Sequence, residues 1–364
     1  MSSKRIHNFA AGPAVLPVPV LEQVQRDLLA LPGVGMSILE ISHRSKTFES
    51  ILAETEADIR ALAAIPSNYR VLFMQGGASL QFSMVPMNLL GAAETADYID
   101  GGSWAAKAIQ EARKVGNVNV AASTKGERYG RLPAQAELKL TSGAAYVHMT
   151  SNNTIEGTEY KQLPDVDAPL VSDTSSDMFS RPIDISRHAL VYAGAQKNMG
   201  PAGVTIVIIR DDLLERAATR KSSLPTMMSY AVLAENNSLY NTPPTFAVYA
   251  VGLVMKWVKA QGGLPGMAAR NERKAQKLYA EIDRTGFFRG TARKEDRSMM
   301  NITFRMATEA LEKSFVAEAT AAGLDGLEGH RSVGGIRASL YNAFPEEGVD
   351  ALVAFMKEFE RRNG

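Results

Sequence analysis

One lysine stands in the stretch Val191-Tyr192-Ala193-Gly194-Ala195-Gln196-Lys197-Asn198-Met199-Gly200-Pro201-Ala202-Gly203, within a turn of small residues. The apolar run 188–193 leads into this turn, and the β-branched run 204–209 leaves it. Runs of this kind are typical of buried strands. Desolvation at the end of such a strand lowers the pKa of a lysine and frees its amine to act as a nucleophile. The alternative is an exposed turn lysine, which is the usual state of this residue type.

The composition is that of a globular protein of enzyme size. The 364 residues are 45 % hydrophobic and 22 % charged, with a net charge of +1. A net charge so close to zero gives no indication of binding to nucleic acid or to an anionic membrane. There is no cysteine, which excludes disulfides, thiolate metal sites and a cysteine nucleophile, and which favours a reducing compartment. No signal-peptide pattern opens the chain, and no apolar run reaches the roughly 20 residues of a membrane span. We therefore expect a cytoplasmic enzyme.

Strand-like and helical segments alternate along most of the chain, which predicts an α/β fold with a mostly parallel, buried sheet. A helix is expected over 45–65. The seven expected strands are 70–74, 96–100, 118–122, 144–149, 168–173, 188–193 and 204–209. A helical pattern starts at Thr245 and breaks at the Gly/Pro-containing segment 261–265. Beyond the break, helices at 308–321 and 345–361 alternate with strands at 299–305 and 335–341. We expect a large domain, 15–260, and a smaller C-terminal α+β domain, 261–364, joined by the segment 1–14.

Asp173 ends the apolar run 168–173, so it and Lys197 both lie at the carboxyl ends of consecutive strands. Ligands of open α/β sheets bind at this edge. An aspartate that holds a pyridinium nitrogen and a lysine that forms an imine are the two groups that pyridoxal phosphate (PLP) requires of its protein. Taken alone, Asp173 is more often a helix cap or a structural acceptor.

Two further strand ends carry residues suited to a phosphate and to a flat ring. Gly76-Gly77-Ala78-Ser79 joins a strand to a helix, where backbone N–H groups can approach a phosphate. Such a turn is weak evidence by itself, and it is neither a Walker A loop nor a G-x-G-x-x-G fingerprint. Trp104 lies at the next strand–helix junction, where an indole is able to stack on a pyridine ring. An ordinary core aromatic is the alternative.

Four stretches together resemble one enzyme family. They are Asn8-Phe9-Ala10-Ala11-Gly12-Pro13-Ala14-Val15-Leu16-Pro17, Ile41-Ser42-His43-Arg44-Ser45, Gly76-Gly77-Ala78-Ser79 and Gln196-Lys197-Asn198. In combination they look like the phosphoserine aminotransferases, class V aminotransferases among the fold type I PLP enzymes. The resemblance covers essentially the whole chain, through His330-Arg331-Ser332-Val333-Gly334-Gly335-Ile336-Arg337-Ala338-Ser339. It implies a large PLP-binding domain with a mostly parallel seven-stranded sheet and a smaller C-terminal α+β domain.

The resemblance also implies a role for each matching residue. Lys197 resembles the lysine that binds PLP, Asp173 the partner of the pyridinium nitrogen, and Trp104 the stacking ring. Thr154 matches a position beside the cofactor's phenolic oxygen. The positions around the cofactor phosphate are matched by Ala78, Ser79 and Gln196 and, from the other subunit, by Asn241 and Thr242. The pattern therefore implies a homodimer with shared active sites. Some relatives carry arginine where Ser79 stands, so backbone N–H groups should contribute more to phosphate binding here.

Basic residues fit a substrate with two acidic groups. His43-Arg44 and His330-Arg331 each pair a histidine with an arginine, and Arg337 follows in a strand-like segment. Arginine suits bidentate binding of carboxylate and phosphate, so this set fits a substrate that carries both. Solvated surface arginines are the alternative. The resemblance implies substrate binding for all five residues, with Arg337 at the α-carboxylate.

The reaction that the resemblance implies has two half-reactions. L-Glutamate gives its amino group and leaves as 2-oxoglutarate, and 3-phosphohydroxypyruvate then receives the group to become O-phospho-L-serine, in serine biosynthesis. Use of the phosphorylated hydroxythreonine of vitamin B6 synthesis stays open. The alternatives are a serine–pyruvate or alanine–glyoxylate aminotransferase, and a PLP-binding homologue without turnover. The lack of cysteine excludes a cysteine desulfurase, and the lack of a Gly-rich dinucleotide fingerprint disfavours an oxidoreductase.

Overall fold

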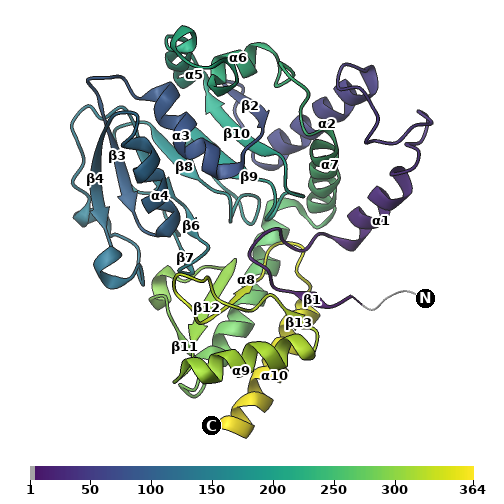
Figure 1. The fold of residues 1–364 in the computed structure, drawn as a ribbon, viewed down its shortest axis with the longest axis vertical. Helices are drawn as coiled ribbons and strands as arrows, with labels where there is room; N and C mark the ends of the chain where they lie inside the picture. The colour runs from purple at the N-terminus through teal and green to yellow at the C-terminus, as the bar shows by residue number, and fades with distance from the viewer. Residues whose placement is uncertain (1–4) are drawn as a thin grey trace.

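A seven-stranded sheet forms the centre of the larger part of the molecule in the computed structural model, which describes residues 5–364 (Figure 1). Its strands, in spatial order, are β2 (Tyr69–Met74), β10 (Thr205–Arg210), β9 (Leu190–Gly194), β8 (Leu170–Asp173), β5 (Val147–Thr150), β3 (Thr95–Asp100) and β4 (Asn117–Ser123). Only β10 runs antiparallel to its neighbours within this sheet. The expected α/β fold with a mostly parallel seven-stranded sheet is confirmed.

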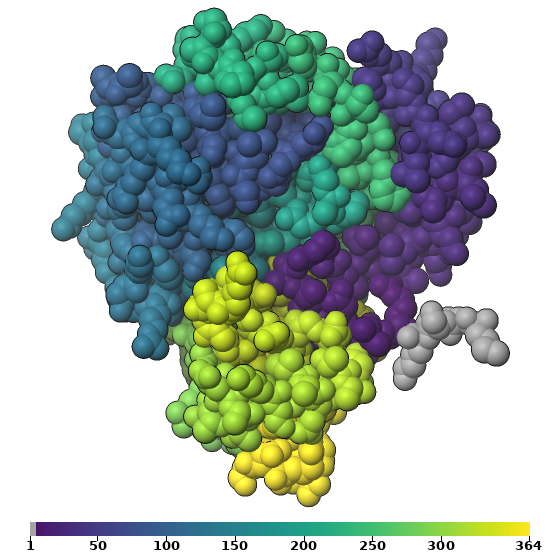
Figure 2. Space-filling view, viewed as in Figure 1, coloured from purple at the N-terminus to yellow at the C-terminus, as the bar shows by residue number. Residues whose placement is uncertain are grey.

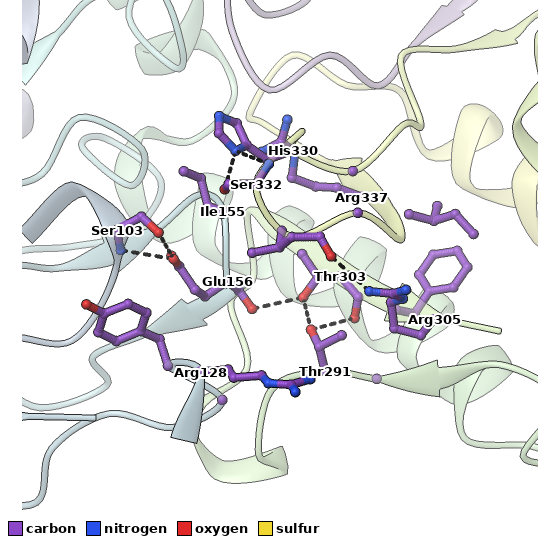
Figure 3. Close-up of a pocket in the computed structure, with 18 of the residues that line it drawn as sticks. Ser103, Arg128, Ile155, Glu156, Thr291, Thr303, Arg305, His330, Ser332 and Arg337 are labelled. Carbon is purple, nitrogen blue, oxygen red and sulfur yellow. Dashed lines mark hydrogen bonds between the residues drawn. The ribbon is translucent and has the colours of Figure 1, made fainter. Parts of the chain in front are cut away.

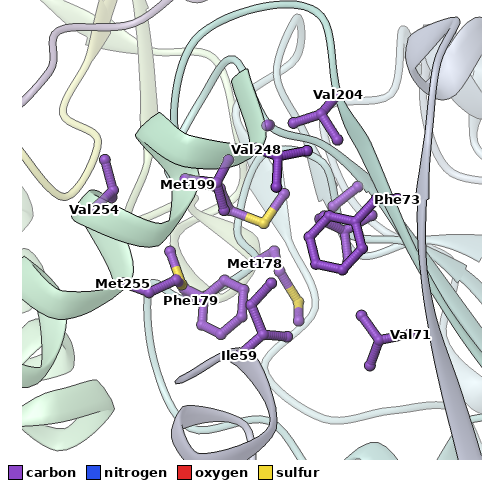
Figure 4. Packing of buried hydrophobic residues seen from close by; sticks show 14 of the residues in the cluster. Ile59, Val71, Phe73, Met178, Phe179, Met199, Val204, Val248, Val254 and Met255 are labelled. Atoms are coloured by element: carbon purple, nitrogen blue, oxygen red, sulfur yellow. The ribbon is translucent and has the colours of Figure 1, made fainter. Parts of the chain in front are cut away.

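Helices cover both faces of this sheet, which is why its central strands β8 and β9 are buried along their whole length. One face packs against α1 (Val18–Asp27), α2 (Lys46–Leu62) and α7 (Thr245–Ala260), and the other against α3 (Gly77–Leu89), α4 (Ser103–Ala112), α5 (Asp211–Ala218) and α6 (Tyr230–Glu235). Successive residues of β10 alternate between the two cores, as strand geometry requires: Ile206 and Ile208 face α7, and Val207 and Ile209 face α3. Figure 4 shows the first of these cores, with Phe73 against Val204 and Val248.

The smaller part has its own core, formed by α8 (Gly263–Ile282), α9 (Glu309–Ala321), α10 (Glu346–Asn363) and a three-stranded antiparallel sheet. The strands of that sheet are β11 (Arg289–Gly290), β12 (Asn301–Arg305) and β14 (Ile336–Ser339). Near the N-terminus, β1 (His7–Asn8) pairs in parallel with β13 (Leu324–Asp325), and Phe9 packs on Phe344 with ring centroids 4.4 Å apart. The N-terminal segment therefore lies at the junction of the two parts, as the purple atoms in Figure 2 show.

The helices and strands differ from the expected ones mainly at their ends. The helix expected over 45–65 is α2, which begins at Lys46 after the N-cap Ser45. The strand expected from 144 begins at Val147, because the preceding residues bond to β3 without forming a regular ladder. Helices α1, α5 and α6 were not expected. A short hairpin, β6 (Asn152–Asn153) with β7 (Thr158–Glu159), was also missed.

The break expected at 261–265 falls between α7 and α8, where Gly262 and Gly263 have positive φ angles. The division into domains 15–260 and 261–364 stays a prediction, and residues 1–4 of the joining segment lie outside the described part. Over residues 5–364, no helix combines the length and apolar character needed to cross a membrane.

Candidate active site

The two residues expected to be catalytic lie on the same edge of the central sheet. Asp173 is the last residue of β8, and Lys197 follows Gly194, the last residue of β9. These strands are parallel neighbours, and Asp173 is opposite Tyr192 in their register. The carboxyl ends of both strands therefore meet where ligands of open α/β sheets bind.

Lys197 is half-buried, and its Nζ donates a hydrogen bond to Thr154 Oγ1 at 2.7 Å. Gly12 of the N-terminal segment lies against the Lys197 side chain: a Cβ added at Gly12 would be 3.6 Å from Lys197 Cγ. Burial lowers the pKa of Lys197 to about 8; Asp173 opposes this effect and Arg337 adds to it. A lysine with such a pKa has an appreciable neutral fraction near pH 7, which a Schiff-base nucleophile needs.

Asp173 is buried, and its Oδ1 accepts the Ser175 N–H at 2.9 Å. Burial raises the pKa of Asp173, while the bonds from Ser175 and the charge of Lys197 counteract this rise. A buried carboxylate is stabilised by a cationic partner. A protonated ring nitrogen is a partner of that kind.

The N-terminus of α3 lies two strands away along the same edge. Met74, the last residue of β2, is opposite Thr205, and Thr205 is opposite Gly194. The N-cap of α3 is Gly76, whose φ of +89° favours glycine. A glycine cannot cap the first turn with a side chain, so the backbone N–H groups there are available to an anion.

Of the residues expected at the cofactor phosphate, Ala78 and Ser79 lie in this turn itself. Ala78 is half-buried and Ser79 is exposed, both in the first turn of α3. Gln196 is half-buried directly before Lys197. Thr242 is exposed, and its carbonyl accepts a bond from Gln75 Nε2 at 3.3 Å, so Asn241 and Thr242 lie beside the α3 turn of their own chain.

Trp104 is the second residue of α4 and is half-buried. The Lys107 ammonium lies 4.1 Å from the centroid of its indole ring, within cation–π range. The Glu156 carboxylate lies at the start of the same helix, where Oε1 accepts bonds from the Ser103 N–H at 2.9 Å and from Ser103 Oγ at 2.5 Å.

Two of the five expected substrate-binding residues line one cavity of about 730 Å³ between the larger and smaller parts (Figure 3). Arg337 Nη1 donates to the Thr154 carbonyl at 3.3 Å, and His330 Nδ1 lies 2.7 Å from Ser332 Oγ. Burial lowers the pKa of His330, and the cations Arg337, Lys107 and Arg331 lower it further. Arg331 itself is exposed and lines an adjoining cavity.

His43 and Arg44 are not brought to this cavity within one chain. They lie on the loop that precedes α2 and the N-cap Ser45. His43 Nε2 is buried without a hydrogen-bond partner among the described residues. Their role in substrate binding stays a prediction.

Two residues beside the site were not found from the sequence. Lys107 follows Trp104 by three positions in a helix, a spacing that puts two side chains on one face, so a signal was present. Glu156 bonds to Ser103 across 53 residues of sequence. No local sequence pattern predicts a contact between residues so far apart in the sequence.

The surroundings of Lys197 fit PLP. Among the buried polar atoms without a hydrogen-bond partner within residues 5–364 are Thr150 Oγ1, Trp104 Nε1 and Arg337 Nε. Thr150 is opposite Asp173 in the sheet. Together with a low-pKa amine, a buried carboxylate and an uncapped helix N-terminus, these groups match the requirements of a pyridine ring that carries a phosphate.

Fold and site define a fold type I aminotransferase, and comparison with known proteins agrees. The family model described as aminotransferase class-V matches residues 6–352. The chain belongs to the class V aminotransferases.

Within that family it belongs with the phosphoserine aminotransferases. The enzyme of that name from Desulfatibacillum aliphaticivorans is 56 % identical over 363 residues, which cover 99 % of each chain. Among solved structures, the phosphoserine aminotransferase from Bacillus circulans subsp. alkalophilus is 50 % identical, with a TM-score of 0.97 and full coverage of both chains. A PLP-bound phosphoserine aminotransferase from Trichomonas vaginalis is 41 % identical, with a TM-score of 0.93, over 97 % of this chain and 100 % of that one.

Proposed function

We propose that the chain is a PLP-dependent homodimeric enzyme that converts 3-phosphohydroxypyruvate and L-glutamate to O-phospho-L-serine and 2-oxoglutarate, a step of serine biosynthesis in the cytoplasm. The observation that carries the proposal is the Lys197 amine, which has a lowered pKa and lies at the same sheet edge as the buried Asp173. The full-length relatives named phosphoserine aminotransferases support the choice of substrate.

PLP, when bound, supplies an electron sink for the electron pair that is released at the substrate Cα. Lys197 would hold the cofactor at its aldehyde carbon, and Asp173 would keep a proton on its ring nitrogen. Trp104 would cover one face of the ring. The first turn of α3, with Ala78 and Ser79, would bind the phosphate through backbone N–H groups.

Lys197 has a second task, as the group that moves the substrate proton. Its free amine would take the proton from the substrate Cα as a general base, and the resulting ammonium would be the general acid that delivers a proton to the carbon that was the cofactor's aldehyde. A pKa near 8 suits both tasks at neutral pH, because each protonation state is accessible. Thr154 Oγ1, which accepts the Lys197 bond at 2.7 Å, holds the amine in place between these steps.

Arg337 would bind the α-carboxylate of the substrate. Its Nε is buried without a partner in the described chain, and its Nη1 bond to the Thr154 carbonyl keeps it beside Lys197. His330 and Arg331 would bind the distal phosphate. In a homodimer with shared sites, His43 and Arg44 would reach the same phosphate from the other subunit.

A comparison of reaction rates with different amino donors tests which substrate the enzyme prefers. Purified enzyme is given 2-oxoglutarate with O-phospho-L-serine, L-serine or L-alanine, and glutamate formation is measured. We expect phosphoserine to react fastest by orders of magnitude, and Arg331→Ala to lose that preference more than it loses activity on serine. Equal rates on serine or alanine would show a different class V aminotransferase. The phosphorylated hydroxythreonine of vitamin B6 synthesis is measured in the same assay.

Subunit mixing tests both the nucleophile and the shared site. Lys197→Ala is expected to abolish turnover, whereas Lys139→Ala, at an exposed lysine, retains it. Lys197→Ala and Arg44→Ala subunits, mixed and refolded, form some dimers with one intact site if Arg44 acts across the interface. Activity should then reappear on mixing. If mixing restores nothing, Arg44 does not serve the partner's site.

A further inference from the structure

The segment 153–157, from the last residue of β6 through the connection to β7, contacts several parts of the candidate site. Thr154 accepts the Lys197 amine on its hydroxyl and Arg337 on its carbonyl. The Glu156 carbonyl accepts a bond from Thr303 Oγ1 of β12 at 2.9 Å, which ties the connection to the smaller part. This connection therefore sets the relative positions of the reactive lysine and the expected carboxylate-binding arginine.

The Glu156 side chain extends from this connection to α4. Its Oε1 accepts both the backbone N–H and the hydroxyl of Ser103, the first residue of the helix, as the dashed lines in Figure 3 show. The first N–H groups of a helix have no partner within it, and a carboxylate also interacts favourably with the positive end of the helix dipole. Glu156 thus serves as the cap of α4 from a distant part of the chain.

The backbone around α4 explains why a distant residue serves as its cap. The N-cap position is Gly102, which has no side chain to offer. A Cβ at Gly102 would collide with Asn153 Oδ1 and would lie 3.0 Å from Glu156 Oε2. The usual capping residues are therefore excluded, because the space that their side chains would need is filled by the connection that delivers Glu156.

Trp104 follows Ser103 directly, so the bonds that hold the start of α4 also fix the backbone from which the indole projects. We propose that Glu156 is a positioning residue, which fixes Trp104 relative to Lys197 and so shapes the stacking surface for the cofactor ring. This inference rests on the proposed PLP site. It adds Glu156, which lines the same cavity as Arg337 and His330, as a residue that acts on the stacking surface through Ser103 and Trp104.

The test uses Trp104 as its own reporter. The chain has two tryptophans, so a Trp257→Phe background leaves Trp104 as the single emitter. In that background Glu156→Ala removes the acceptor, and Glu156→Gln keeps an oxygen at the same place. Thr308→Ala is the matched control, because it removes the side-chain cap of α9, where Thr308 Oγ1 accepts the Leu311 N–H at 3.2 Å.

Three quantities are measured for each variant: acrylamide quenching of Trp104 in the cofactor-free protein, the PLP dissociation constant, and the melting temperature. We expect Glu156→Ala to increase quenching and to weaken PLP binding about five-fold, the equivalent of one lost cap. Glu156→Gln should stay near the parent in both. Thr308→Ala should lower only the melting temperature.

Unchanged quenching and PLP affinity in Glu156→Ala, with only a lower melting temperature as in Thr308→Ala, would overturn the inference. Glu156→Gln behaving like Glu156→Ala would also overturn it, because the acceptor at Ser103 would then not be what holds the ring. Failure of the parent protein to bind PLP is a different result, since it refutes the proposed function and leaves the quenching comparison intact.

Discussion

Lys197 is expected to titrate far below an ordinary lysine in the cofactor-free protein. Its pKa falls from 10.5 to about 8, chiefly because the amine is buried. At pH 7 a pKa of 8 leaves about one amine in eleven neutral, against roughly one in three thousand for a pKa of 10.5. The site should therefore present about 300 times more free amine than an unperturbed lysine does.

Two neighbours should move this titration in opposite directions. Asp173 raises the pKa of Lys197, so Asp173→Asn should lower the midpoint further. Arg337 lowers it, so Arg337→Met should raise the midpoint. Thr154→Val serves as a third variant, because it removes the hydrogen bond at Nζ without changing any charge.

The assay is trace acetylation of the cofactor-free protein from pH 6 to pH 11, followed by peptide mass spectrometry. Lys125, which is exposed, serves as the reference for the reagent in each sample. A Lys197 midpoint near 8 supports the reasoning. A midpoint at or above 10 would refute the role of burial, and shifts of the same sign in Asp173→Asn and Arg337→Met would refute the electrostatic account.

Phe73→Ala should destabilise the protein by about 3–5 kcal/mol in urea unfolding, because Phe73 is buried in the core shown in Figure 4. Phe73→Leu should cost much less, and a cost under about 1 kcal/mol for the alanine variant would contradict this packing. Gly157→Ala should lower the melting temperature more than Gly286→Ala: both glycines have positive φ, but only a Cβ at Gly157 would meet Thr303 Oγ1 and the Asn301 carbonyl. Equal decreases in the melting temperature of the two variants would mean that the strain of a positive φ, and not the steric clash at Gly157, determines the loss of stability. Burial raises the pKa of Asp177 from 3.8 to about 7, so the folded state keeps this proton to higher pH than the unfolded chain. The free energy of unfolding should therefore decrease as the pH rises from about 4 to about 7. Asp177→Asn should show a smaller drop in melting temperature from pH 5 to pH 8 than the parent does.

The sheet, and the edge at which its strands carry Asp173 and Lys197, were predictable because both depend on local sequence. A strand buried on both faces is a short apolar run, and its last residue follows directly from where that run stops. The positions of Asp173 and Lys197 at the ends of β8 and β9 needed no further information. The polar turn after each run then marked the edge where ligands bind.

Features that depend on distant contacts could not be predicted in this way. The β6–β7 hairpin has two residues in each strand, too few to show a period. The cap of α4 comes from Glu156, and nothing near Ser103 in sequence indicates it. His43 and Arg44 lie on the loop before α2 and do not line the cavity of His330 within one chain, which no local pattern indicated.

The pairing of β1 with β13 has a consequence for the order of synthesis. Phe9 is synthesised more than three hundred residues before its partner Phe344. Until then, Phe9 and the strand beside it have no native neighbours in the smaller core. The segment that carries Gly12 to Lys197 can therefore dock fully only when the chain is nearly complete. A nascent chain halted before Leu324 would contain Lys197 but not the anchored N-terminal segment whose Gly12 lies against it.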